Sequence, residues 1–349
     1  MTPEDASFQR LACHAPSDER YGYLRDSGPT GAPGKLSYFF ALDLHQSIDI
    51  LPRLLGSIVQ AIHFLGPHNC ALSVTEGRST DGTFEILKLL RPEIEGIGAT
   101  YFFNTSDSDP LAADRVEALA GLRNLALENL VSYPEWYSPN ATVIFLNDVV
   151  ICVNDILELV HQRVLQKADM TCAMDWTYVG PDPTFYDVWV ARGMNGDTFF
   201  DIPSDGSWDS AWELFWNNPT AEKSYDSNQA FQVFSCWNGA AAFTARPLLE
   251  QKIQFRGPHE GECYQGEPQL FCQDMWRFGY GRIAVVPSVN LGYSDKAGRT
   301  IQALKGQVSR HFKSSMAQIE WKSTPPELVK CMASSYKSQP WVAWNETLK

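Results

Sequence analysis

The stretch ATVIFLNDVVIC (residues 141–152) joins a run of strand-forming apolar residues to two polar residues, Asn147 and Asp148. The apolar run is β-branched, aliphatic and aromatic, which suits a strand buried on both faces of a parallel sheet. A helical pattern follows at 153–167, with Asn154 placed to cap it. Because ligands bind outside the carboxyl ends of strands in open α/β sheets, Asp148 is expected to face a ligand. The simpler alternative is an aspartate that only caps a turn.

Strand and helix patterns alternate along the chain around this stretch. Apolar runs predict strands at 36–45, 70–76, 99–105, 169–176, 231–243 and 282–293. Amphipathic patterns predict helices at 50–66, 84–93, 114–133 and 268–281. Strands that alternate with helices form right-handed βαβ units. We therefore expect an α/β fold of Rossmann-like type, with a mostly parallel sheet flanked by helices.

The texture of the sequence divides the chain into three parts. Residues 1–35 are rich in Pro, Gly, Ser and Asp and predict an irregular N-terminal arm or stem. Residues 36–295 form the predicted domain, and 296–349 are a polar tail expected to pack on it. Within the domain, 177–230 is dense in aromatic residues, Pro and Gly without a sustained period. It is expected to be an insertion over the ligand edge of the sheet.

Composition limits the classes of protein to which the chain can belong. The 349 residues are 44% hydrophobic, enough for a substantial core, and the net charge of −13 argues against nucleic acid as a partner. There is no apolar run of about 18 residues to span a membrane, and residues 1–35 lack the apolar core of a signal peptide. The sequence indicates a folded globular protein.

Cysteines and sequons give a weak indication of a secretory compartment. The chain has eight cysteines and the sequons at Asn104, Asn140 and Asn345. Cys263 and Cys272, flanked by polar residues, are the best candidates for a disulfide, with each other or with other loop cysteines. No CxxC pair or Cys/His cluster has zinc spacing.

Polar residues stand at the ends of several predicted strands. They are Asp43, His45, Glu76, Arg78, Asn147, Asp148 and Asp175. Such a row on one edge of the sheet predicts a binding site. The GxGxxG, GxxxxGK[ST] and GxSxG motifs are missing, which counts against a dinucleotide oxidoreductase, a P-loop NTPase and an α/β-hydrolase. A divalent metal held by a strand-end carboxylate would neutralise a diphosphate without a glycine-rich loop.

Several long motifs together resemble one known family. They are VTEGRSTDGTFEIL, RNLAL, FLNDVVICVNDILELV, DMTCAMDW, FYDVWVARGMNGDTFF and FQVFSCWNGAAAF. In this order, over residues 36–295, they resemble the fungal capsule-associated α-1,3-mannosyltransferases of the cryptococcal type. The resemblance implies a GT-A glycosyltransferase that uses GDP-mannose, Mn²⁺ (or Mg²⁺) and an oligosaccharide or polysaccharide acceptor. It also implies a type II membrane protein of the Golgi lumen, with its single anchor upstream of this chain.

The resemblance assigns Asp148 as the metal-binding carboxylate of a degenerate DxD motif. Since the sequence reads Asn-Asp-Val-Val at 147–150, the second carboxylate is missing. The metal would take further ligands from the diphosphate, water or a distant side chain. By analogy with other GT-A transferases, His311 is a candidate for that ligand; the alternative is a surface histidine.

The nucleoside and phosphate contacts follow in the same way. Glu76 resembles the acidic residue that GT-A folds use on the nucleoside, but the following Gly-Arg replaces the expected Asn-Gly and leaves the role of Arg78 open. Arg115 or Arg123 is a candidate for the donor phosphates, against the alternative of a solvated helix face.

Two further motifs point to the transferred sugar. Trp237, Asn238 and Gly239 stand at a strand end, where a glycine lets the backbone approach a sugar and an aromatic ring offers a stacking face. The alternative is a core tryptophan beside a bulge. At 266–268, Gly-Glu-Pro replaces the family's Ser-Glu-Cys, so Glu267 keeps its carboxylate while one family cysteine has become proline.

An α-linked product from GDP-mannose implies retention of configuration. Retention proceeds by double displacement on a carboxylate nucleophile or by front-face attack. Because no nucleophile can be assigned, the front-face route is favoured, with Asp175, Glu267 and Asp274 holding sugar hydroxyls. The alternatives are a secreted glycosidase and a catalytically silent GT-A-like protein that binds glycans.

Overall fold

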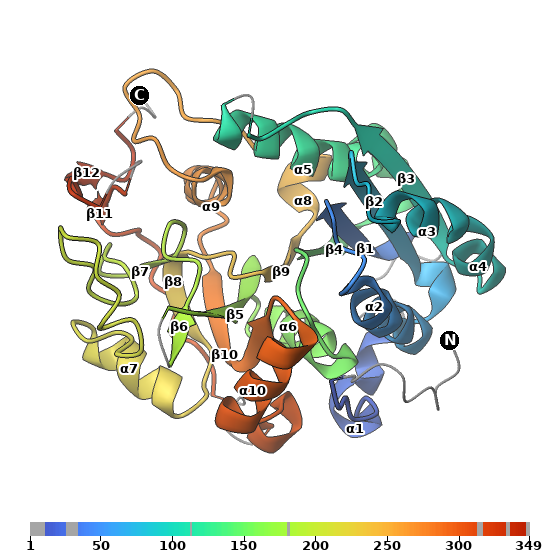
Figure 1. The fold of residues 1–349 in the computed structure, drawn as a ribbon, viewed down its shortest axis with the longest axis horizontal. Helices are drawn as coiled ribbons and strands as arrows, with labels where there is room; N and C mark the ends of the chain where they lie inside the picture. The colour runs from blue at the N-terminus through green and yellow to red at the C-terminus, as the bar shows by residue number, and fades with distance from the viewer. Residues whose placement is uncertain are drawn as a thin grey trace.

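The structure, a computed structural model, describes residues 11–25, 34–111, 114–179, 182–312, 317–332 and 336–346. Its centre is a ten-stranded sheet in the order β3-β2-β1-β4-β9-β5-β10-β8-β7, with β6 paired to β5 (Figure 1). The strands are β1 (Leu36–Leu44), β2 (Cys70–Gly77), β3 (Thr100–Ser106), β4 (Tyr137–Leu146), β5 (Met170–Tyr178), β6 (Pro183–Phe185), β7 (Arg192–Gly193), β8 (Phe231–Ser235), β9 (Ala240–Thr244) and β10 (Ile283–Gly292).

The first four strands of the chain form a continuous parallel block. Strand β1 lies between β2 and β4 and is parallel to both. The antiparallel strand β9 separates β4 from β5, and β10 is again parallel to β5. The predicted α/β fold with a mostly parallel sheet is thereby confirmed.

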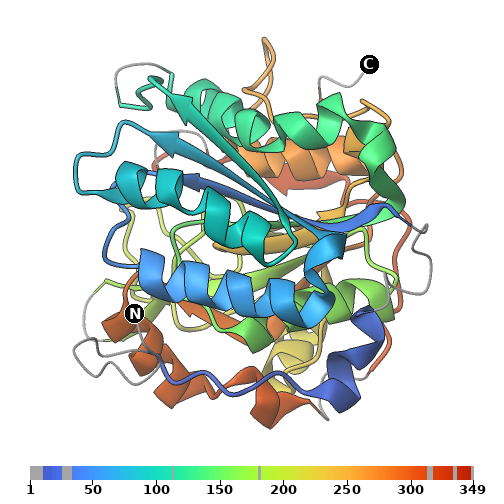
Figure 2. The same cartoon turned by 90° about the vertical axis from the view of Figure 1, so that its right-hand side faces the viewer.

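Two layers of helices cover the sheet (Figure 2). The helices are α1 (Asp18–Tyr21), α2 (Leu51–Leu65), α3 (Thr83–Leu89), α4 (Arg91–Gly96), α5 (Arg115–Ser132), α6 (Val153–Leu165), α7 (Pro219–Asp226), α8 (Arg246–Leu249), α9 (Glu267–Arg277) and α10 (Asp295–Lys305). Phe39 and Val143 pack in the same core cluster as residues of α5 and α9, whereas Phe40 and Ile144 pack with residues of α2 and α6. Successive strand residues therefore feed opposite layers. None of the helices in the described ranges has the length and hydropathy to cross a membrane.

The segment 231–243, predicted as one strand, is two strands in different places of the sheet. Strand β8 pairs with β7 and β10, while β9 lies between β4 and β5. The chain turns between them because Asn238 and Gly239 adopt positive φ angles of 56° and 77°. A left-handed pair of residues reverses the chain where the hydrophobic pattern alone looks continuous.

The start of α6 also differs from the prediction. The N-cap residue is Cys152 rather than Asn154, and in a capping box Asp155 Oδ2 accepts a hydrogen bond of 2.8 Å from the Cys152 backbone N–H. The Asn154 side chain instead donates to the carbonyl oxygens of His14 and Ala15 in the N-terminal arm.

The described parts of the N-terminal arm and the C-terminal tail contain regular structure and long-range contacts, while 1–10 and 26–33 of the predicted arm lie outside the described residues. In the arm, the side chains of Arg20 and Tyr21 bind the buried Glu158 of α6 at 2.7 and 2.8 Å. The C-terminal tail contains α10, the 3-10 turn Val308–His311 and the hairpin of β11 (Leu328–Lys330) and β12 (Trp341–Ala343). Long-range partners, which composition does not reveal, hold both segments on the domain.

Three disulfides join distant parts of the chain: Cys13–Cys152, Cys172–Cys236 and Cys263–Cys331. The Cys263–Cys272 pairing is wrong, and Cys263 pairs instead with another loop cysteine. Cys272 is a free, buried thiol on α9 that lies 3.9 Å from the Met170 sulfur. It faces the sheet, so it cannot reach the loop that carries Cys263.

Candidate active site

A cleft opens at the carboxyl ends of the central strands, where the sequence predicts it. It consists of two adjoining cavities of about 500 and 390 Å³. Both are lined by Arg115, Leu119, Arg123, Asn147, Tyr186 and Tyr293. The larger we call the β1 end and the smaller the α9 end, and together they form the cleft.

Besides Asn147, the β1 end contains four of the predicted strand-end residues. Asp43, His45, Arg78 and Asp148 all line it. The ring of His45 hydrogen-bonds to the Gly77 carbonyl oxygen, and Arg78 forms an ion pair of 2.9 Å with Asp109 at the rim. This end thus combines two carboxylates with cationic side chains.

Glu76 does not line the cleft, although it ends a neighbouring strand. Its side chain is only 3% exposed, and Oε1 accepts a hydrogen bond of 2.7 Å from the Ser79 backbone N–H. The Glu76 carboxylate thereby stabilises the turn between β2 and α3. The predicted nucleoside contact therefore receives no support from the position of this side chain.

The two carboxylates of the β1 end resist ionisation. Burial raises the pKa of Asp43 to about 6; the charge of Arg123 opposes this shift, while Glu267 and Asp148 add to it. The surrounding protein also raises the pKa of Asp148, although its side chain stays open to solvent. A cation between Asp43 and Asp148 would stabilise the ionised form of both carboxylates.

Arg123 connects the two ends of the cleft. Its Nε lies 2.8 Å from Glu267 Oε1, and its Nη1 lies 3.4 Å from Asn147 Oδ1. Its guanidinium stacks 4.5 Å from the centre of the Trp237 ring, and the Trp237 indole N–H donates to Asn147 at 3.0 Å. Four separate segments of the chain thereby bring the predicted residues Arg123, Glu267, Asn147 and Trp237 into one cluster. Trp237 is a core side chain and also part of the cleft wall.

Gly239 allows a close approach of three segments behind the cleft. Its carbonyl oxygen accepts a hydrogen bond of 2.9 Å from the Asn147 backbone N–H. A Cβ at this position would lie 3.0 Å from Val149 Cγ1 and 3.3 Å from Asp175 Cβ. The glycine is thus needed for packing as well as for its positive φ.

Replacing Gly239 by alanine is expected to lower the free energy of unfolding by about 2–4 kcal/mol, because strain at positive φ and crowding add. The matched control is Gly261→Ala, with a similar φ of 80° and no atom within 4 Å of the added Cβ. It should cost about 1 kcal/mol, from the backbone alone. Urea unfolding measures both, and equal costs would contradict the crowding argument.

Asp175 lies behind the cleft wall rather than in it. Its side chain is 0% exposed, Oδ2 accepts a 2.6 Å hydrogen bond from the Tyr293 hydroxyl, and Oδ1 has no partner among the described residues. Burial, with the nearby charge of Asp187, raises the pKa of Asp175 well above its ordinary value. Asp175 is therefore connected to the cleft through its hydrogen bond with Tyr293, which lines both ends.

Three cleft residues escape the sequence reasoning: Tyr186, Asp187 and Tyr293. Asp187 Oδ2 accepts a 2.7 Å hydrogen bond from the Asn238 backbone N–H, and burial raises the pKa of Asp187 to about 6. Tyr293 directly follows β10, so the strand-end rule, applied to that strand too, would have found it. The other two lie in the 177–230 insertion, which carries no regular pattern.

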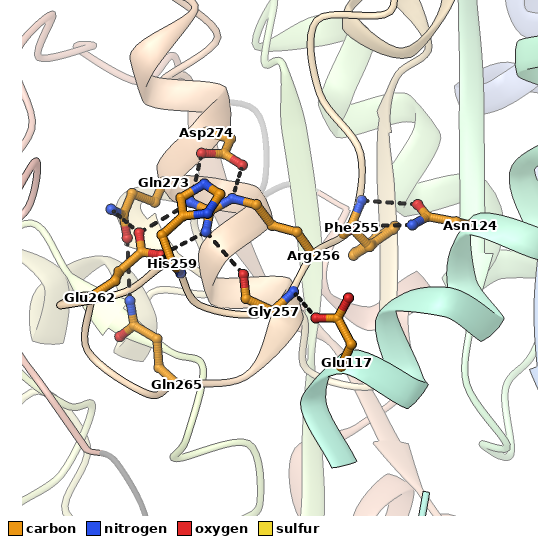
Figure 3. A network of polar contacts seen from close by, with 10 residues as sticks. All are labelled: Glu117, Asn124, Phe255, Arg256, Gly257, His259, Glu262, Gln265, Gln273 and Asp274. Atoms are coloured by element: carbon orange, nitrogen blue, oxygen red, sulfur yellow. Dashed lines mark hydrogen bonds and ion pairs between the residues drawn. The ribbon is translucent and has the colours of Figure 1, made fainter. Parts of the chain in front are cut away.

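Asp274 is not brought to the cleft. Its carboxylate binds Arg256 through Nε at 2.8 Å, and Arg256 also binds Glu262 at 2.6 Å (Figure 3). This network fixes the loop before α9 and borders a separate cavity between α5 and α9. Since Asp274 follows Glu267 by two helical turns, it lies about 10 Å further along α9.

His311 is also remote from Asp148. It lies beyond α10, and its Nε2 is 2.9 Å from the Lys305 carbonyl oxygen. It lines neither end of the cleft. Among the described residues, no group of three or more His, Cys, Asp or Glu side chains is arranged to hold a metal.

An α/β sheet with a carboxylate- and arginine-lined cleft at its strand ends has charged side chains at the edge where proteins of this fold class bind ligands. Residues 37–274 match the family described as Cryptococcal mannosyltransferase 1, and the chain belongs to this family, as predicted. It is 33% identical over 318 residues to Alpha-1,3-mannosyltransferase CMT1 of Cryptococcus neoformans var. neoformans serotype D. That match covers 84% of this chain and 67% of the relative.

Two solved structures are similar to this chain at low sequence identity. S. aureus TarS in complex with UDP gives a TM-score of 0.44 at 13% identity and covers 74% of this chain. Mannosyltransferase PcManGT from Pyrobaculum calidifontis, in complex with GDP-Man and Mn²⁺, gives 0.40 at 10% identity and covers 78%. The chain spans 60% and 62% of their lengths, respectively.

Proposed function

We propose that the chain is a metal-dependent, retaining glycosyltransferase of the GT-A type. It transfers mannose from GDP-mannose to a mannose-containing glycan, in α-1,3 linkage. The observation that carries the proposal is the cleft, which joins Asp43, Asp148 and Arg123 to an end lined by aromatic and polar side chains. Family membership supports mannose transfer, and the name of the relative supports the linkage.

The residues present fit a divalent cation in part. Asp148 and Asp43 would hold it, because carboxylate oxygens suit Mn²⁺ and Mg²⁺, and oxygens of the donor diphosphate and water would complete the ligand set. When bound, the cation would stabilise the negative charge of the leaving diphosphate. Arg115 lines both ends of the cleft and is the candidate for the phosphates. Arg123 forms an ion pair with Glu267 and borders the α9 end of the cleft, where the sugar would lie.

The sugar would lie at the α9 end. The Tyr293 hydroxyl donates its hydrogen to Asp175. The hydroxyl oxygen of Tyr293 can therefore accept a hydrogen bond from a sugar hydroxyl. In front-face attack, the bond from the anomeric carbon to the diphosphate breaks on the face where the acceptor oxygen bonds. The acceptor proton passes to a diphosphate oxygen. Asp187 and Glu267 would stabilise positive charge on the sugar, and the 177–230 insertion would shape the acceptor site.

Cation binding is expected to weaken as the pH falls below about 6. Because the pKa of Asp43 is raised to about 6, this carboxyl gains a proton just below neutral pH, and a neutral carboxyl is a poor ligand. The apparent Kd for Mn²⁺ should rise about tenfold per unit of pH below this value for each proton displaced. Titration of Mn²⁺ between pH 5 and 8 measures it. A pH-independent Kd, or an Asp43→Asn variant with the same profile, would rule out this role.

Thermal stability with nucleotides and metal tests the proposal most directly. GDP with Mn²⁺, at about 100 times its Kd, should stabilise the fold by about 2.7 kcal/mol, whereas UDP or a chelator should not. Transfer from GDP-mannose to an α-mannoside, with the linkage read by NMR, would then establish the reaction. Binding without transfer would favour a silent glycan-binding protein. Hydrolysis of a glycan without nucleotide or metal would favour a glycosidase.

We propose the Golgi lumen as the site of action, with the protein a type II membrane protein as predicted for the family. The three disulfides support an oxidising secretory compartment. The sequon residue Asn345 is exposed, as glycosylation would require. Sensitivity of the expressed protein to an endoglycosidase, with co-localisation with a Golgi marker, tests this placement.

A further inference from the structure

A second polar cavity, here called the basic pocket, opens at the other edge of the sheet. It has a volume of about 590 Å³ and is lined by the first residues of β1, by Ser138, Asn140 and Thr142 of β4, and by Asp169 just before β5. These are the amino-terminal ends of the strands whose carboxyl ends form the cleft. Thr142 lines the pocket and Asn147, five residues further along the chain, lines the cleft, so about 17 Å separates the nearest positions of the two sites.

Four cations from three parts of the chain line the basic pocket. They are Arg163 and Lys167 at the end of α6, Arg246 at the start of α8, and Arg282 before β10. Asp169 is the one carboxylate in the lining, and it is committed to Arg282, whose Nη2 and Nε lie 3.2 and 3.3 Å from its oxygens. The pocket is therefore cationic in a chain whose net charge is −13.

Cations at the carboxyl end of a helix are common, since the helix dipole favours them. That explanation covers Arg163 and Lys167 but not Arg246 or Arg282, which lie on other elements. Four cationic side chains that line one pocket are instead typical of a site that binds anions.

Arg163 lines the pocket and hydrogen-bonds to Thr142, which also lines it. Its Nη2 donates to Thr142 Oγ1 at 2.7 Å, but its buried Nε has no hydrogen-bond partner among the described residues. Burial lowers the pKa of Arg163 to about 10, so the group stays charged at neutral pH. The charge of Arg163 therefore adds to those of Lys167 and Arg246 in the lining of the pocket.

The pocket also has an apolar wall. Phe278 and Tyr280 line it beside the cations. Aromatic rings pack on the apolar face of a sugar, while arginine forks match the oxygens of a phosphate. The volume exceeds that of a phosphate alone. We propose that the basic pocket binds the phosphate of a phosphorylated sugar, at a site separate from the catalytic cleft.

The test is direct binding, in chloride buffer of constant ionic strength. Calorimetry with mannose 6-phosphate should show one saturable site, inorganic phosphate should bind the same site more weakly, and free mannose should not bind. A saturating concentration of GDP should leave this binding unchanged. Complete displacement by GDP, or absence of saturable binding, would overturn the proposal.

Variants then locate the site. Lys167→Gln/Arg246→Gln changes two exposed side chains of the pocket and should weaken mannose 6-phosphate binding at least about tenfold. The matched control, Lys88→Gln/Lys223→Gln, removes the same charge from exposed helix positions outside it. The control should bind as the parent protein does. Equal weakening in both variants would show a general charge effect and sink the proposal. Because the readout involves no sugar transfer, failure of the proposed function would leave this test intact.

Discussion

Replacing Asp148 by asparagine is expected to lower the rate of mannose transfer about a thousandfold, the scale seen when one key electrostatic group is lost from an active site. Asp148 lines the β1 end of the cleft. Its side chain is exposed, so its carboxylate oxygens are accessible to a cation. Asparagine keeps the shape but loses the charge, so both Mn²⁺ affinity and kcat should fall. Steady-state kinetics over a range of Mn²⁺ concentrations measures both.

The matched control for this variant is Asp107→Asn. Asp107 is exposed after β3, close to the rim of the cleft but outside its lining. The control removes the same charge and should retain the activity of the parent protein. If Asp148→Asn kept full activity and an unchanged affinity for Mn²⁺, Asp148 would have no role in the site, whatever the activity of the control.

Replacing Arg123 by methionine is expected to lower the free energy of unfolding by about 3–5 kcal/mol, the cost of removing one partner of a buried ion pair. Arg123 and Glu267 lie 2.8 Å apart, and both side chains are almost inaccessible to solvent. Without the arginine, Glu267 is left as an uncompensated charge in the protein interior. Urea unfolding measures the loss.

A double-mutant cycle separates this cost from simple loss of packing. Glu267→Gln removes the carboxylate's charge with little change of shape, so the double variant Arg123→Met/Glu267→Gln should be more stable than the sum of the single changes implies. Additive losses would show that the pair does not interact. Because both residues border the cleft, all three variants should also lose transfer activity, and an active double variant would contradict their place in the site.

The strand-end rule predicted the cleft because the carboxyl ends of parallel strands share one edge. Asp43 and Asp148 meet there although 105 positions separate them in the chain. The rule fails for Glu76, whose neighbouring turn offers a closer backbone donor at Ser79. It also says nothing of Asp187, because the insertion that carries this residue has no periodic pattern from which to place it.

Residues chosen for chemistry alone were placed less well. Asp274 and His311 have suitable side chains, but Arg256 and the Lys305 carbonyl oxygen hold them elsewhere. The disulfides show the same limit. Cys263 pairs with Cys331 because two loops meet in space, whereas Cys272, closer in sequence, faces the sheet from α9.

The sequence by itself determined the alternation of strands and helices, the class of fold and the edge of the sheet where ligands bind. These follow from local patterns, since periods of two and 3.6 residues decide which faces are buried. Only the tertiary structure decided that Arg123 pairs with Glu267, that Asp175 hydrogen-bonds to Tyr293, and that four distant cations converge on the basic pocket. Such partners are far apart in the chain, and their contact depends on how the packed layers bring the ends of separate elements together.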